Sequence, residues 1–233
     1  MKRESDSISE HDIGSKYFCR FLFSGEAKNL KLVIEESTIG GDWKLFVNNV
    51  EIKKWVRQRF FDCNNKVADV SYAIKEGSTP TLNIIKIETR GLEHGLKEVP
   101  YLCGVFTCEY RYSHNSFPFL KGATGNVLLE NLLPWDIIGY PTFSGTATYE
   151  REFELTEAQE LYLDLGRVED IADVKLDGSQ IKILPWPPYA CCLGKVSSGK
   201  HHLNIAVTNA TANRTRAARL TAGLLGPVKL FRM

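Results

Sequence analysis

Two stretches of the chain begin with the same three letters: residues 82–91 are LNIIKIETRG, and residues 203–214 are LNIAVTNATANR. In the second stretch, Leu203, Ile205 and Val207 alternate with polar residues, the period of two that places apolar side chains on one face of a β-strand. Each stretch then passes into turn-forming and polar residues. The pair predicts one strand written twice, and therefore a duplicated fold.

A hairpin pattern precedes each of these strands. Residues 42–52, DWKLFVNNVEI, place a polar turn at Asn48 between two alternating segments. Residues 172–183, ADVKLDGSQIKI, do the same at Asp177. Asn, Asp and Gly tolerate the left-handed backbone that a two-residue hairpin needs, so both segments predict tight β-hairpins.

Short alternating segments with a turn signal every 8–12 residues or so fill the rest of the chain, which is typical of antiparallel sheets packed as a sandwich or barrel. A length of 233 residues allows one or two domains, each able to bury its own core. We predict an all-β chain with two tandem galactose-binding-like jelly-roll β-sandwiches, in residues 16–112 and 113–233. A polar, disordered lead-in is expected in residues 1–15.

Composition and charge exclude several classes of protein. The net charge of +1 gives no strong field for nucleic acid, so no nucleic-acid partner is expected. Apolar runs of about seven residues fall short of the ~20 that cross a bilayer, so no membrane association is expected. The polar start has no signal-peptide core, and the sequence assigns no compartment. The six cysteines lack C-x-x-C spacing, which favours reduced thiols over a metal or redox motif.

Four landmarks follow one another in the second half: a strand opened by Gly and Tyr, a hairpin, a Trp-Pro-Pro-Tyr loop, and a Gly-x-x-x-Leu strand that ends in Asn. The residues are Gly145, Tyr149, Leu176-Asp177-Gly178, Trp186 to Tyr189, Gly199, Leu203 and Asn209. Over residues 139–230 this order resembles the galactose-binding-like jelly roll of glycoside hydrolases. The resemblance is to the sugar-binding domain of family 2 and to the C-terminal module of α-L-rhamnosidase-like enzymes, with Asp177 where Asn is usual.

The resemblance implies an accessory role beside a catalytic glycosidase domain or subunit. Hydrolysis of a glycosidic bond needs two carboxylates that face each other across the sugar, and in these families they come from a separate barrel domain. Glu150, Glu152 and Glu154 alternate along one strand, and we interpret them as a solvent-facing row. No catalytic residue, cofactor or metal ligand is therefore predicted in this chain.

Aromatic and polar residues near the end of the chain are the candidate carbohydrate site. Trp186 and Tyr189 lie in a proline-stiffened loop, where their rings could stack on a sugar or close the end of the sandwich. Asn209, Asn213 and Arg214 follow the last long strand, and they could bind sugar hydroxyls or the backbone of their own loop. These five residues are the predicted carbohydrate-binding set.

Other conspicuous residues receive structural interpretations. His201 and His202 are adjacent in a strand and so point to opposite faces, which disfavours a shared metal ion. Trp135 and Tyr140 are expected in a linker that packs one domain on the other. Trp55 lies in a basic segment that could bind an anionic sugar or polymer, although a surface loop is favoured. The sequons at Asn209 and Asn213 are treated as incidental.

The sequence thus predicts a non-catalytic, carbohydrate-associated β-sandwich module of a glycoside hydrolase, which supports the enzyme or binds sugar weakly. The alternative is a free-standing protein-interaction module built from jelly-roll domains.

Overall fold

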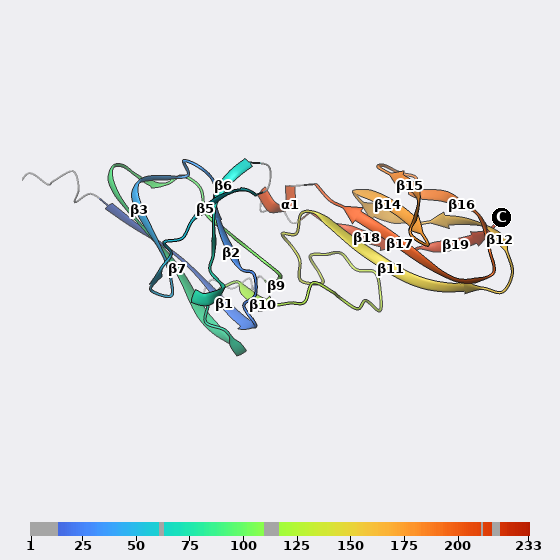
Figure 1. Ribbon diagram of the computed structural model, residues 1–233, viewed down its shortest axis with the longest axis horizontal. Helices are drawn as coiled ribbons and strands as arrows, with labels where there is room; N and C mark the ends of the chain where they lie inside the picture. The colour runs from blue at the N-terminus through green and yellow to red at the C-terminus, as the bar shows by residue number, and fades with distance from the viewer. Residues whose placement is uncertain (1–13, 61–62, 110–116, 211, 216–219) are drawn as a thin grey trace, which may run out of the picture. The chain divides into compact units, whose positions relative to one another are not determined.

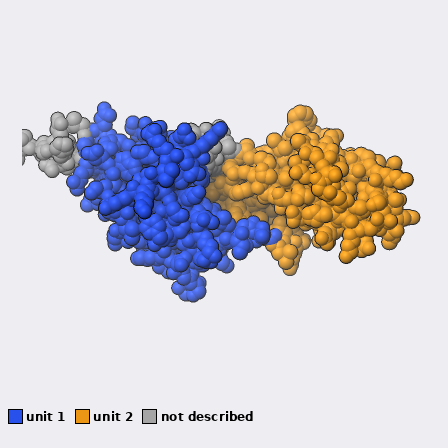
Figure 2. Space-filling view, in the orientation of Figure 1, with its two compact units in different colours: residues 1–127 blue, residues 128–233 orange. Residues whose placement is uncertain are grey.

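The computed structural model describes residues 14–60, 63–109, 117–210, 212–215 and 220–233. The chain divides into two compact units, Met1–Val127 and Leu128–Met233, which Figure 2 colours separately. The predicted boundary between residues 112 and 113 falls in 110–116, and the predicted lead-in falls largely in 1–13, both outside the described residues. We describe each unit, called unit 1 and unit 2, by itself.

Unit 1 contains two β-sheets (Figure 1). The larger sheet has the strand order β4-β3-β7-β1-β10-β9, and the smaller has the order β5-β6-β2-β8. The strands of the larger sheet are β1 (Gly14–Gly25), β3 (Ile39–Val47), β4 (Val50–Glu51), β7 (Gly77–Leu96), β9 (Phe106–Glu109) and β10 (Phe119–Gly122). The smaller sheet and a short 3-10 turn comprise β2 (Lys31–Ile34), β5 (Val56–Phe60), β6 (Cys63–Asp69), β8 (Tyr101–Cys103) and η2 (Ser71–Ala73).

Unit 2 contains a four-stranded sheet of order β11-β17-β14-β15, a three-stranded sheet of order β16-β12-β19, and the strand pair β13-β18. The four-stranded sheet is built from β11 (Thr146–Leu155), β14 (Ile171–Leu176), β15 (Ser179–Leu184) and β17 (Gly199–Thr208). The remaining elements are β12 (Gln159–Asp164), β13 (Arg167–Glu169), β16 (Ala190–Val196), α1 (Ala212–Thr215), β18 (Gly223–Gly226) and β19 (Lys229–Arg232).

Each unit buries one hydrophobic core between its sheets. In unit 2, Leu163 of the three-stranded sheet and Ile205 of the four-stranded sheet belong to the same buried cluster. In unit 1, Phe23 and Leu32 come from different sheets and share the other cluster. The predicted all-β class is confirmed, because strands form both cores. No helix in the described parts of the chain is long and apolar enough to cross a membrane.

The two units share a strand order. In the larger sheets, β4-β3-β7-β1 corresponds to β15-β14-β17-β11, and in the smaller sheets β6-β2-β8 corresponds to β16-β12-β19. The matched strands also follow one another in the same order along the chain. This common topology is what a duplication would produce, while the duplication itself and the jelly-roll assignment of both units stay predictions.

The repeated letters LNI do not occupy equivalent positions in the two units. Leu82 is 39% exposed and Asn83 is fully buried, whereas Leu203 is 4% exposed and Asn204 is only partly buried. Adjacent residues of a strand point to opposite faces, so the two stretches face the core with opposite phase. The residue-by-residue match that opened the sequence analysis is therefore wrong, although both stretches lie in the central strands β7 and β17.

The hairpins supply the correct correspondence. Asn48 and Asp177 have φ values of 49° and 50°, which confirms the predicted left-handed turns. The Asn48 backbone N–H donates to the carbonyl of Ile84 at 2.9 Å, and its Oδ1 accepts the N–H of Ile84 at 3.0 Å. Asp177 makes the same two bonds with His202, at 2.9 and 2.8 Å. Ile84 of unit 1 thus corresponds to His202 of unit 2.

Trp135 belongs to the core of unit 2, which corrects its expected placement in a linker. Its side chain is 3% exposed, and its Nε1 donates to the hydroxyl of Tyr149 at 2.7 Å. Its backbone N–H donates to the carbonyl of Ala222. Because a buried indole N–H needs an acceptor, Tyr149 of β11 fixes this ring inside the sandwich.

His201 is buried against the same hairpin and carries a positive charge. Its Nδ1 lies 2.7 Å from Oδ2 of Asp177, and its Nε2 lies 2.9 Å from the carbonyl of Ser197. Both partners are acceptors, so both ring nitrogens must carry a proton. The hydrogen bond with Asp177 raises the pKa of His201 and lowers the pKa of Asp177. Among the described residues, no cluster of His, Cys, Asp and Glu is able to hold a metal ion.

We expect the contribution of this pair to stability to depend on pH. The raised pKa of His201 means that its contribution is complete below the ordinary value of 6.5 and is lost as pH rises through the folded-state pKa. The lowered pKa of Asp177 means that its contribution is present above 3.8 and is lost at lower pH. Urea unfolding of the wild type and His201→Gln should therefore differ most between these two values.

His202→Gln is the matched control, because the charge of this neighbouring imidazole is the smallest of the causes that lower the pKa of Asp177, whereas the hydrogen bond of His201 is the largest. A stability difference for His201→Gln that is constant from pH 4 to pH 9 or so would contradict the charged state assigned to His201.

Candidate functional site

A pocket of about 210 Å³ opens in unit 2 where loops join its strands. The residues that line it come from three segments, and they are Arg167, Glu169 and Asp170, then Asn209, Ala210 and Asn213, and finally Leu220, Thr221 and Ala222. Sites for drug-sized ligands usually measure roughly 300–1,000 Å³, so this pocket suits a smaller ligand, of the size of a single sugar ring. It contains two of the five residues predicted to bind carbohydrate, Asn209 and Asn213.

Both asparagine side chains are bonded to backbone groups of other segments of unit 2. Asn209 accepts the N–H of Gly145 at 2.9 Å and donates to the carbonyl of Phe143 at 2.8 Å. Asn213, which is 4% exposed, donates to the carbonyl of Leu220 and accepts its N–H, both at 3.0 Å. These amides mimic a backbone partner, so they hold two loops in place and shape the pocket.

The charged side of the pocket is also ordered by internal bonds. Arg167 Nε and Nη2 each lie 2.8 Å from Glu169 Oε1. Asp170 Oδ2 accepts the backbone N–H of Ala210 at 2.8 Å, which joins the first segment of the pocket to the second. The hydroxyl of Tyr189 donates to the backbone carbonyl of Asp170. Tyr189, one of the predicted sugar-binding aromatics, therefore binds Asp170, which lines the pocket, and does not line the pocket itself.

The pKa of Tyr189 is raised above its ordinary value. Burial is the main cause, and the nearby negative charges of Asp170 and Glu169 add to it. The phenol consequently remains protonated at neutral pH and can keep donating its hydrogen bond. The hydroxyl of Tyr189 positions Asp170, and the residue as a whole is partly exposed.

Trp186 is 71% exposed, and it is not among the residues that line the pocket. A ring that plugs the end of a sandwich would be buried, so the exposure of Trp186 excludes that interpretation. The proline-stiffened loop instead presents the indole to solvent, as a stacking platform requires. Whether Trp186 binds a sugar stays a prediction.

The remaining sequence candidates have plain structural outcomes. The side chain of Arg214 lies outside the described residues. Glu150, Glu152 and Glu154 are exposed on β11, which confirms their interpretation as a solvent-facing row. The sequon asparagines use their amide nitrogens for internal hydrogen bonds, as expected if the sequons are incidental.

Sequence reasoning missed Arg167, Glu169, Asp170 and Thr221 as residues of the pocket. One available signal was the charged run at 167–170, which interrupts two otherwise apolar strand segments. Polar residues at such a break often form a loop site. Nothing in the sequence indicated that residues 220–222 would lie beside them.

No protein-family profile matches this chain. A protein of Formosa agariphila named as a β-glucuronidase is 32% identical over 107 residues, which is 42% of this chain and 9% of that protein. The chain therefore corresponds to a small part of this relative. Its sequence is similar to a segment of a glycoside hydrolase.

Solved structures of glycoside hydrolases are also similar, at low scores. A rhamnosidase from Novosphingobium sp. PP1Y has a TM-score of 0.40 at 21% identity, and the likeness covers 86% of this chain and 22% of that chain. A GH2 β-galacturonidase from Eisenbergiella tayi has a TM-score of 0.33 at 20% identity, covering 54% of this chain and 22% of that chain. Both scores are too low to compare the chains as whole folds.

We expect Asn213→Ala to destabilise unit 2 by about 2 kcal/mol. The substitution removes two hydrogen bonds to the backbone of Leu220, and each such bond contributes roughly 0.5–1.5 kcal/mol to stability. Thermal unfolding followed by circular dichroism measures the change. Asn204→Ala, which removes an exposed amide on β17, should leave the melting temperature within about 1 °C. Equal shifts for the two variants would contradict the role given to Asn213.

Proposed function

We propose that this chain is a non-catalytic β-sandwich module of a glycoside hydrolase of the rhamnosidase-like or family 2-like type. The observation that carries the proposal is the match to one small part of a much longer β-glucuronidase. A segment that covers 9% of an enzyme corresponds to one of its modules rather than to the whole catalyst. The all-β architecture, with one core between the sheets of each unit, is compatible with such a module.

The state of the carboxylates supports a non-catalytic role. A glycosidase holds two carboxyl groups ~5–5.5 or ~6.5–9.5 Å apart across the sugar and keeps them available for the reaction. In the pocket of unit 2, Glu169 is paired with Arg167, and Asp170 is bound to the N–H of Ala210. Through these contacts, both carboxylates stabilise the structure around the pocket. The catalytic acids would then belong to another domain or subunit of the same assembly.

Weak carbohydrate binding is the second part of the proposal, and unit 2 offers the place for it. The pocket has a mixed polar and apolar lining, is of single-sugar size, and is pre-organised by Asn209 and Asn213. Arg167 and Thr221 line it and carry donors that suit sugar hydroxyls. Trp186 supplies an exposed ring in a neighbouring loop of the same unit.

The non-catalytic role is tested by activity. The purified chain should not hydrolyse p-nitrophenyl glycosides of glucuronic acid, galacturonic acid, galactose or rhamnose above the uncatalysed rate. Hydrolysis that disappears in Glu169→Gln or Asp170→Asn would show that the pocket is an active site, and it would overturn the proposal. Hydrolysis that both variants retain would indicate a contaminating enzyme.

Sugar binding is tested by calorimetric titration of the same monosaccharides. We expect dissociation constants near 1 mM. If the sugar occupies the pocket, Arg167→Ala should weaken binding at least tenfold, because it removes a contact worth about 1.4 kcal/mol or more. If the sugar stacks on the exposed indole instead, Trp186→Ala should have that effect. Tyr72→Ala is the control, since Tyr72 is an equally exposed aromatic residue, 66% exposed, in unit 1. Absence of binding to every sugar would leave the supporting role and remove the sugar-binding part of the proposal.

A further inference from the structure

Two neighbouring rows of side chains cross the outer face of the larger sheet of unit 1. Ile85 and Ile87 of β7 point into the core, so Lys86 and Glu88 point outward. Glu88 lies opposite a lysine on each side, Lys16 of β1 and Lys44 of β3. This row therefore places a lysine on each side of Glu88.

The second row is aromatic. Lys86 lies opposite Phe18 of β1 and Phe46 of β3. Arg20 follows Phe18 on the same face of β1, because it is two residues further along the strand. We call this surface the cation–aromatic face, and it comprises Lys16, Phe18, Arg20, Lys44, Phe46, Lys86 and Glu88.

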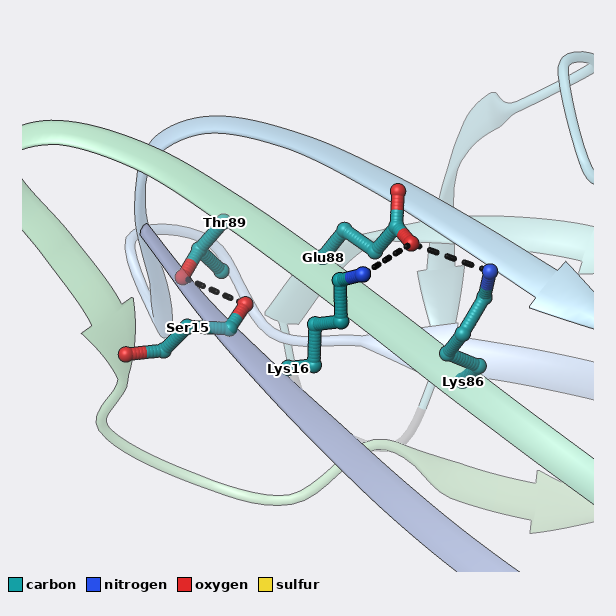
Figure 3. Close-up of polar contacts among 5 residues, drawn as sticks. All are labelled: Ser15, Lys16, Lys86, Glu88 and Thr89. Carbon is teal, nitrogen blue, oxygen red and sulfur yellow. Dashed lines mark hydrogen bonds and ion pairs between the residues drawn. The ribbon is translucent and has the colours of Figure 1, made fainter. Parts of the chain in front are cut away.

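Two lysines of this face, Lys16 and Lys86, are paired with Glu88 (Figure 3). One oxygen of its carboxylate lies 3.0 Å from the Lys86 ammonium and 3.8 Å from the Lys16 ammonium. The hydrogen bond from Lys86 is the main cause of the lowered pKa of Glu88, so this carboxylate stays ionised. Lys86 also lies 4.1 Å from the centroid of the Phe46 ring. Two cations are thus positioned before any ligand arrives.

The face keeps an excess of positive charge and one open ring. Four cations, Lys16, Arg20, Lys44 and Lys86, accompany the carboxylate of Glu88, while Glu51, which lies opposite Phe46, is paired with Lys53. Phe18 is 53% exposed, and the Arg20 guanidinium lies 5.7 Å from its centroid. Because the guanidinium lies over this ring, a pyranose would contact the part of Phe18 that stays exposed while its carboxylate pairs with Arg20.

The shape of the face favours an extended ligand. Outward residues recur every ~6.8 Å along a strand, and neighbouring strands lie ~4.8 Å apart. A polymer with a carboxylate on successive sugar rings can meet several cations of such a surface at once, which multiplies weak contacts. The whole chain has a net charge of only +1, far from the strongly basic balance typical of nucleic-acid binding.

We propose that the cation–aromatic face of unit 1 binds a uronic-acid polysaccharide through its carboxylates. The proposal rests on the proposed function, because it assumes that the chain works beside carbohydrate. It assigns unit 1 a ligand surface separate from the pocket of unit 2.

Affinity electrophoresis of the full chain in gels containing polygalacturonate tests this inference. The wild type should be retarded, and Lys16→Ala/Lys44→Ala should bind at least tenfold more weakly. Phe18→Ala should also weaken binding, by severalfold. The control is Lys54→Ala/Arg59→Ala, which removes the same charge from the basic segment around Trp55 and should change binding less than twofold. Unchanged melting temperatures establish that the variants are folded.

Ionic strength and other polymers complete the experiment. Retardation by polygalacturonate should fall as NaCl rises from about 50 to 300 mM, because salt screens exposed charges, and neutral dextran should not retard the chain. The inference is overturned if polygalacturonate has no effect at low salt, if only dextran sulfate or double-stranded DNA binds, or if the control variant loses binding equally. Such failure together with intact sugar binding by the pocket would leave the proposed function standing.

Discussion

The register of each unit depends on one contact, in which a hairpin residue with a left-handed backbone forms hydrogen bonds with the central strand. Asn48 in unit 1 and Asp177 in unit 2 each exchange two hydrogen bonds with the backbone of one residue, Ile84 or His202. A slip of one residue in a strand turns every side chain to the other face. By fixing this one position, the hairpin decides which residues of β7 and β17 enter the core.

The same register decides what remains for function. In β17 the inward residues Leu203, Ile205 and Val207 are all buried, so none of them is available to bind a ligand. Beyond its last residue the chain leaves the sheet. Asn209 then bonds the backbone of Phe143 and Gly145, and Asn213 bonds the backbone of Leu220, so these amides join the end of β17 to two other segments beside the pocket. The pocket thus forms where β17 ends and the chain leaves the sheet.

The sequence predicted the parts of this architecture that depend on local pattern. Alternation identified the strands, and Asn48 and Asp177 identified the turns, because left-handed backbone is a property of single residues. The letter match between the LNI stretches failed, since identical letters do not specify which face meets the core. Trp135 was misplaced for a related reason. Its hydroxyl partner on Tyr149 is fourteen residues away, and only the packed sandwich brings the two together.

The candidate site was predicted by position more than by role. Asn209 and Asn213 line the pocket as expected, but their amides are engaged by the backbone, and the charged residues beside them come from a different loop. Sequence spacing does not indicate which distant residues come together, because their contact depends on how the sheets pack on each other.

Aligning the units through their hairpins shows where they are free to differ. Lys86 of unit 1 corresponds to Asn204 of unit 2, and its neighbours Phe18 and Phe46 correspond to Glu150 and Lys175. The adjacent row of Lys16, Glu88 and Lys44 corresponds to Thr148, Ala206 and Asp173. Most inward positions of both central strands are apolar, and the polar exceptions Asn83 and His201 are bonded internally, because an unpaired polar group would destabilise the core. The outward positions carry no such constraint, so unit 1 can present a cationic, aromatic face where unit 2 presents a mixed one.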